Sequence, residues 1–101
     1  MKVIDSVDIN KIENIICKVF NITKEDLYSN RKYRSHTDAR SVLFYILHVK
    51  YYISFYKLAK MYNRSHSIII RSVNKCEYLK RYDKDFKEKL LMCELQIESN
   101  S

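Results

Sequence analysis

The segment of residues 64–75 combines short polar side chains with cations, and this combination suits recognition of a polyanion. Its side chains that can form hydrogen bonds or carry positive charge include Arg64, Ser65, His66, Ser67, Arg71 and Lys75. The first acid downstream is Glu77. A helix that lies in the major groove of DNA uses such groups to meet base edges and phosphates. The alternative is an ordinary amphipathic helix with a solvated polar face, because periodicity alone fits both.

A second basic stretch covers residues 29–36 and reads Ser-Asn-Arg-Lys-Tyr-Arg-Ser-His. It has no hydrophobic period, so we expect a loop. Its cations are Arg31, Lys32 and Arg34, and guanidinium and ammonium groups are common partners of phosphate. Tyr33, between two of these cations, is a further candidate for contact with a nucleic-acid backbone.

Apolar residues at helical spacing predict six helices around these two segments. The expected bounds are 9–20, 23–28, 37–51, 55–62, 65–81 and 83–98. Thr37 and Ser54 are the expected N-caps of the third and fourth helices. Asn63 suits a left-handed turn between the fourth and fifth helices. These two helices and their short connection match the helix-turn-helix pattern.

The composition favours one all-α domain. The chain has 101 residues, enough for one core, and 47% of them are hydrophobic. Glycine and proline are both absent, whereas small sheet-rich domains rely on them at turns. We therefore expect a small helical bundle with a helix-turn-helix, in which residues 1–101 form a single domain.

The positive charge is concentrated in the middle of the chain. Residues 31–81 carry twelve Lys and Arg against two acids, a net charge of +10. Residues 1–30 carry a net charge of −1 and residues 82–101 a net charge of −2. Clustered positive charge indicates a polyanionic partner. Nucleic acid is the leading partner, and membrane surfaces and acidic proteins are the alternatives.

Several classes are excluded by what the sequence lacks. Without glycine there is no P-loop, so we expect no bound nucleotide. The three cysteines match no zinc spacing, and we expect no metal and no other cofactor. Neither a nucleophile motif nor a pair of carboxylates stands out, so we do not expect an enzyme. No leader and no apolar run of membrane length is visible, which favours a cytoplasmic protein with reduced cysteines.

The segment after Asn63 resembles a family signature. It reads Arg64-Ser65-His66-Ser67-Ile68-Ile69-Ile70, similar to the Arg-Asp-His-Thr-Thr-Val-Ile of the C-terminal DNA-binding domain of the bacterial replication initiator DnaA. Further blocks agree in order, namely the basic loop, Ala39-Arg40 before an apolar helix, Ser54-Phe55 with Leu58-Ala59 and Tyr62, and Val19-Phe20-Asn21-Ile22 with Asp26-Leu27. The resemblance covers residues 8–80 and leaves an extra C-terminal helix at 83–98.

The resemblance implies a Trp-repressor-like fold with a helix-turn-helix in the major groove of duplex DNA and a basic-loop arginine in the adjacent minor groove. Carried over, the minor-groove residue is Arg31, while Arg64 contacts a phosphate or base and Arg40 contacts a phosphate. His66 and Ser67 would face bases. The other expected contacts are Lys32, Arg34, Ser54, Ser65, Ile68, Arg71 and Lys75.

The segment departs from the family pattern at three places, and the first two affect the expected specificity. Ser65 stands where the family has Asp, whose carboxylate accepts a hydrogen bond from a cytosine amino group. Ile68 stands where the family has a second Thr, and its side chain still suits contact with a thymine methyl group. One Gly of the family's usual pair before Arg64 is missing, and Asn63 stands in place of the other. Recognition of the initiator's own DNA box therefore does not follow from the resemblance.

The leading hypothesis is sequence-preferring binding of double-stranded DNA, in replication initiation or its regulation. The second is a protein-interaction module that mimics the initiator domain and binds a replication protein through the acidic C-terminal helix. RNA is a third partner that the charge leaves open. Because the chain has no P-loop, the ATPase of a complete initiator is not part of it.

Overall fold

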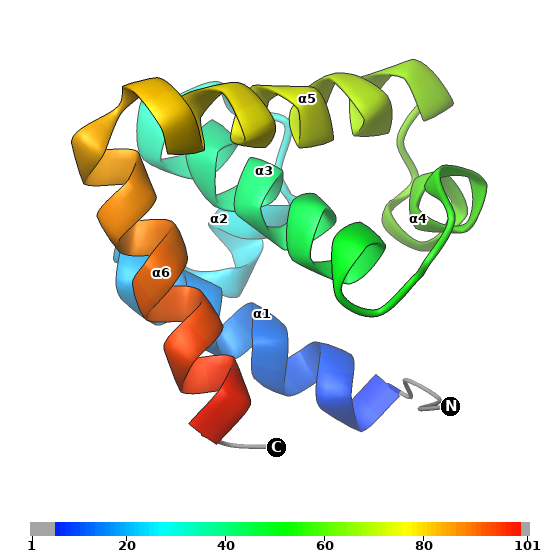
Figure 1. The fold of residues 1–101 in the computed structure, drawn as a ribbon. Helices are drawn as coiled ribbons and strands as arrows, with labels where there is room; N and C mark the ends of the chain where they lie inside the picture. Colours follow the sequence, from blue (N-terminus) through cyan, green and yellow to red (C-terminus); the bar gives the residue numbers. More distant parts are fainter. Residues whose placement is uncertain (1–5, 100–101) are drawn as a thin grey trace.

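Six helices and no strands make up residues 6–99, the part of the chain that the computed structural model describes, with side chains from residue 9 (Figure 1). They are α1 (Ser6–Phe20), α2 (Lys24–Tyr28), α3 (Arg34–Val49), α4 (Phe55–Tyr62), α5 (His66–Tyr82) and α6 (Lys84–Ser99). The all-α fold predicted from the sequence is confirmed.

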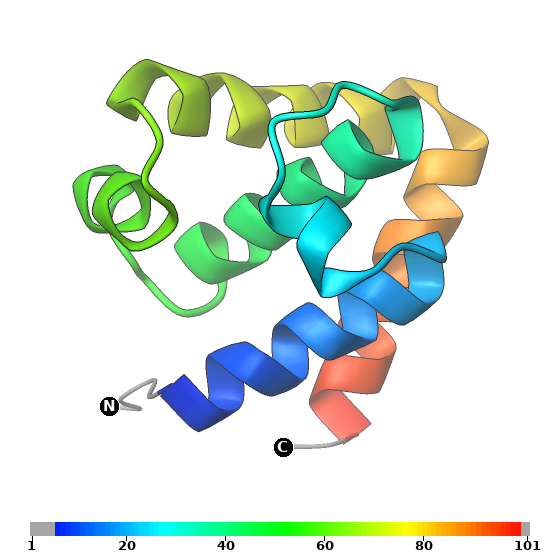
Figure 2. The same cartoon turned by 180° about the vertical axis from the view of Figure 1, so that it is seen from behind.

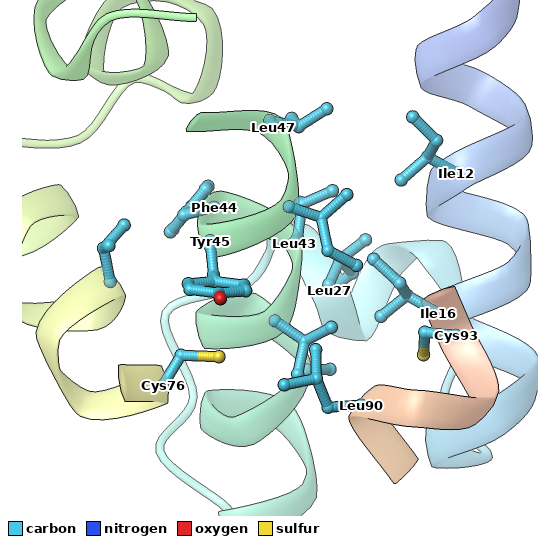
Figure 3. Close-up of a cluster of buried hydrophobic side chains, with 14 of the residues drawn as sticks. Ile12, Ile16, Leu27, Leu43, Phe44, Tyr45, Leu47, Cys76, Leu90 and Cys93 are labelled. Carbon is cyan, nitrogen blue, oxygen red and sulfur yellow. The ribbon is translucent and has the colours of Figure 1, made fainter. Parts of the chain in front are cut away.

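The central helix is α3, which contacts each of the other five helices. Almost every side chain from His36 to Leu47 is buried, as its largely apolar sequence predicts. Figure 3 shows buried side chains of the other helices around it, and those labelled are Ile12, Ile16, Leu27, Cys76, Leu90 and Cys93. Each large apolar side chain buried in this way stabilises the fold by about 1.5–3 kcal/mol.

Short polar side chains mark the ends of α2 and α4, and the predictions made for Ser54 and Asn63 are confirmed. Thr23 and Asp26 form a reciprocal capping box at the start of α2, with each side chain accepting a hydrogen bond from the other residue's amide. The Ser54 hydroxyl caps α4 by accepting from the Lys57 amide at 3.1 Å. Asn63 ends α4 in the left-handed conformation, with φ of 53°. Short polar side chains therefore set the bounds of α2 and α4.

The predicted start of α3 was wrong. The helix begins at Arg34, and Thr37 is not its cap, because the Thr37 hydroxyl donates to the Arg34 carbonyl within the first turn. His36 in this turn is buried, and its ring lies 3.8 Å from the Asp26 carboxylate on α2. A hydrophobic period could not reveal this turn, because all four of its residues, 34–37, are polar. The non-helical basic loop is therefore residues 29–33.

The helices divide into two groups around α3. In Figure 1, α1 and α6 pack together on one side of α3, whereas α4 and α5 lie on the other side. Figure 2, from behind, shows the loop between α2 and α3 running beside α3 toward α5. The fold therefore brings the basic loop and the helix-turn-helix to the same part of the molecule.

Candidate nucleic-acid interface

The two sides of α5 differ in burial. Ile69, Val73 and Cys76 belong to the core, on the side of α5 that packs against α3. The exposed side of the helix carries Ser67, Arg71, Asn74 and Tyr78. This division agrees with the helical spacing in the sequence. Because apolar packing holds the buried side, the polar groups of the exposed side remain available to a partner.

The first turn of α5 carries the residues of the matched signature. Ser65 is the N-cap, and its hydroxyl accepts a hydrogen bond from the Ile68 amide at 3.2 Å. His66 and Ser67 are exposed, and the His66 ring lies edge-on to Phe55 with centroids 6.1 Å apart. Ile68, which follows them in the same turn, is 42% exposed. The free amides of a helix N-terminus also favour negative charge nearby.

The exposed surface of α4 adds cations that the sequence analysis did not single out. Tyr56 and Lys57 are exposed in its first turn, and the Lys60 ammonium lies 5.1 Å from the centre of the Tyr56 ring. The spacing of four residues between Tyr56 and Lys60 was the available signal, because such pairs share one helix face. Positive charge therefore extends onto the first helix of the helix-turn-helix.

The basic loop presents most of its side chains to solvent. Its exposed residues are Asn30, Arg31, Lys32 and Tyr33. Arg34, the first residue of α3, is also exposed, but its guanidinium pairs with the carboxylates of Asp38 and Asp83. A phosphate would have to compete with these two carboxylates for Arg34.

A cleft of about 580 Å³ lies between the basic loop, α3 and α5. The cations on its wall are Lys32, Arg40, Arg64, Arg71 and Lys75. Lys75 pairs with Asp38 at 3.1 Å, whereas the other four cations form no ion pair within residues 6–99. No carboxylate from the described part of the chain lines the cleft. This unbalanced charge makes the cleft attractive to an anion.

Two of these cations point into the protein. Arg40 is 7% exposed, and its guanidinium donates hydrogen bonds to Asp26, Leu27 and Ser29. Arg64 donates to residues 28–30. Burial lowers the pKa of both side chains, and the charge of Arg64 lowers the pKa of Arg40 further. Their direction differs from the outward DNA contacts expected from the sequence, because protein acceptors hold most of their donors.

A buried carboxylate connects α1 with α2 and α4. Glu13 is 5% exposed and accepts hydrogen bonds from the hydroxyls of Tyr28 and Tyr62 and from the Lys24 ammonium. Burial, together with the hydrogen bond to Glu13, raises the pKa of both tyrosines. Since Tyr28 ends α2 just before the basic loop and Tyr62 ends α4, Glu13 links the loop to the helix-turn-helix. The sequence analysis missed this network because Tyr62 lies 49 residues from Glu13.

The remaining reactive side chains are placed in the core. Cys17, Cys76 and Cys93 are free and buried, and burial raises the pKa of Cys76 and Cys93 to about 12. The described residues hold no group of three or more metal-ligating side chains. None of the described helices has both the length and the apolar character that crossing a membrane requires.

The paired helices α4 and α5, their three-residue connection and the cationic surface beside them define a DNA-binding helix-turn-helix domain. Residues 9–76 match the family described as the bacterial dnaA protein helix-turn-helix. The chain belongs to this family, so the resemblance seen in the sequence is confirmed.

Individual relatives agree with the family. The chain is 33% identical over 70 residues to the chromosomal replication initiator protein DnaA of Oleidesulfovibrio alaskensis, covering 69% of this chain and 15% of that protein. It is 27% identical over 79 residues to the protein of the same name from Acholeplasma laidlawii, covering 77% of this chain and 18% of the relative. The chain therefore spans less than a fifth of the length of these relatives.

Proposed function

We propose that this domain binds double-stranded DNA with a sequence preference and acts in replication initiation or its regulation. The observation that carries the proposal is the cleft beside α5, where four cations have no carboxylate partner among the described residues. Sequence-independent attraction to phosphates supplies much of the affinity of DNA-binding proteins. The relatives are named chromosomal replication initiator proteins, which supports the same process for this chain.

In the proposed complex, the first turns of α5 enter the major groove. Its 17 residues span about 25 Å at ~1.5 Å per residue, about twice the ~12 Å width of that groove, so the N-terminal half reads the bases. Ser65, His66 and Ser67 meet base edges, and Ile68 touches a thymine methyl group. Arg71, about one turn further along, contacts a guanine or a phosphate.

The basic loop enters the adjacent minor groove with Arg31, since a narrow minor groove attracts arginine. The DNA strand that separates the two grooves then passes over the cleft, where Lys32 and Lys75 meet its phosphates. Ser54 and Arg34 contribute outer phosphate contacts. Binding of this kind needs no cofactor, nucleotide or catalytic step, and we place it in the cytoplasm.

Competition among nucleic acids tests the proposal. At one salt concentration, a fluorescent duplex DNA should bind more tightly than duplex RNA or single-stranded DNA of the same sequence. With about five phosphate contacts, log affinity should fall with log salt at a slope of about −4 to −5. A slope near zero, or tighter binding to RNA, would contradict duplex DNA as the partner.

A second candidate function is a protein-interaction module that mimics the initiator domain and binds a replication protein. It is favoured by the outer face of α6, where Leu91, Met92 and Leu95 are each about half exposed. This face belongs to the acidic C-terminal part of the chain. Replacing Leu91 and Leu95 with Ser should leave duplex binding unchanged and abolish binding to a purified initiator protein. Unchanged protein binding by the variant would remove this candidate.

A further inference from the structure

We propose that Arg64 and Arg40 are positioning residues that fix the basic loop relative to α5, and so set the spacing between the minor-groove arginine and the recognition helix. The inference rests on the proposed function for what the loop and α5 read. It assigns these two arginines a different role from the direct DNA contacts that the family resemblance implies.

The contacts of Arg64 join the turn of the helix-turn-helix to the loop. Its Nη2 donates to the carbonyl oxygens of Tyr28 at 3.0 Å and Ser29 at 2.8 Å. Its Nη1 donates to the Asn30 side-chain oxygen at 3.1 Å. Arg64 itself lies between Asn63, the end of α4, and Ser65, the N-cap of α5. One guanidinium therefore connects the start of the recognition helix to three consecutive residues that precede Arg31.

Arg40 holds the same segment from the α3 side. Its Nε donates to the Leu27 carbonyl at 2.9 Å, and its Nη2 donates to the Asp26 carbonyl and the Ser29 hydroxyl, both at 3.1 Å. Together the two arginines cover the four consecutive carbonyls of residues 26–29. The last carbonyls of a helix lack partners within it, so these bonds satisfy the end of α2.

The chemistry of arginine suits this role. Its guanidinium is a planar fork with five N–H donors, whereas lysine has one compact ammonium group. Neither Arg40 nor Arg64 forms an ion pair within the described residues, and two positive charges are held near one another against neutral carbonyls. Such an arrangement costs desolvation energy, which the nearby Asp26 carboxylate offsets only in part at Arg40. Phosphates passing over the cleft would supply the missing negative charge.

A double-mutant cycle separates positioning from direct contact. On a duplex with A·T-rich flanks, Arg64→Ala should weaken binding roughly tenfold, the scale of one good groove contact. In the Arg31→Ala background the same change should weaken binding by less than about twofold, because coupled residues are not additive. Equal losses in both backgrounds would mean that Arg64 contacts DNA independently of the loop.

Arg64→Lys provides a charge-matched control. A direct phosphate contact depends on positive charge and survives this change, whereas a fork bonded to three acceptors does not. We expect Arg64→Lys to lose A·T-flank preference as Arg64→Ala does. Near wild-type binding by the lysine variant would overturn the positioning role.

Amide hydrogen exchange of the free protein gives a readout that needs no DNA. Arg64→Ala should speed exchange at the amides of residues 29–33, while Arg71→Ala, also on the cleft wall, should leave them unchanged. Unchanged loop exchange in Arg64→Ala would contradict the positioning role whatever the DNA result. If Arg64→Ala speeds loop exchange but the wild-type protein does not bind duplex DNA, the proposed function is overturned. Arg64 would then hold the loop without setting the spacing of two DNA-binding elements.

Discussion

α5 and the basic loop are both exposed to the proposed partner, yet they are held in place by different forces. α5 is anchored by Ile69, Val73 and Cys76, which are 0%, 5% and 0% exposed. Residues 29–33 include no buried side chain, and the hydrogen bonds of Arg40 and Arg64 hold the start of this segment. The position of α5 therefore depends on apolar packing, whereas the position of the basic loop depends on a few hydrogen-bond donors.

This difference predicts different responses to substitution. Apolar packing is spread over many contacts, so changes on the outer side of α5 should leave its position intact. A loop held by a few hydrogen bonds should move when one donor is lost, because the freed carbonyls have no equivalent partner. Substitutions on the outer side of α5 should therefore alter specificity. Substitutions of Arg40 and Arg64, which anchor the loop, should instead alter the position of the loop relative to α5.

The largest effect is expected from removing an apolar anchor of α5. Ile69→Ala should lower the free energy of unfolding by ~2–5 kcal/mol, because it leaves a cavity between α5 and α3. The neighbouring Ile68→Ala is the matched control, since Ile68 is exposed and should change stability by less than about 0.5 kcal/mol. Urea unfolding of both variants measures the difference. Equal destabilisation by the two changes would mean that α5 is not anchored as described.

A smaller loss of stability is expected from replacing Glu13, the buried carboxylate that links the loop to the helix-turn-helix. Glu13→Ala should destabilise the protein by ~1–3 kcal/mol, because the hydroxyls of Tyr28 and Tyr62 lose a buried acceptor. Glu25→Ala, which removes an exposed carboxylate on α2, is the control. Urea unfolding again gives the measurement. If both variants are equally stable, the Glu13 network does not hold these elements together.

Specificity of α5 is tested at Ser65. Ser65→Asp should create a preference for cytosine at one position of the site, worth ~1–3 kcal/mol. Asp is also a good N-cap, so α5 should keep its start. Affinity for unrelated DNA should fall because the carboxylate repels phosphates. Selection from a random duplex library measures both proteins, and identical preferences would mean that Ser65 faces no base.

The loop is tested by comparing its two exposed cations. Arg31→Ala should weaken binding more on A·T-rich flanks than on G·C-rich flanks, because a narrow minor groove attracts an inserted arginine. Lys32→Ala should weaken both about equally, as a phosphate contact does. Anisotropy titrations with the two duplexes give, for each variant, the ratio of the affinity lost on A·T-rich flanks to that lost on G·C-rich flanks. If this ratio is the same for both substitutions, Arg31 does not lie in the minor groove.

Local features of the molecule could be predicted from the sequence. Ile69, Val73 and Cys76 recur at helical spacing in the sequence, and all three are buried. The Ser54 cap and the left-handed Asn63 depend only on residues beside them. Such features are determined by short-range geometry, so a single sequence contains the information needed to predict them.

Long-range polar contacts could not be predicted. Arg40 was expected to face a phosphate, but its acceptors are backbone atoms 13 and 14 residues away and a serine hydroxyl. Asp38 is buried and pairs with Lys75, which lies on a different helix. Carbonyl acceptors have no sequence signature, because every residue has one. The acceptors toward which a buried arginine side chain points can therefore be identified only from the three-dimensional structure.

The most direct measurement is a titration of the isotopically labelled protein with a duplex selected from a random library, followed by amide NMR. We expect the largest shifts at residues 30–33 and 65–71, on the loop and the start of α5. The amide signals of residues around Leu91 and Leu95, on the outer face of α6, should keep their chemical shifts. Shifts centred on α6, or none at saturating duplex, would contradict DNA binding through the loop and α5.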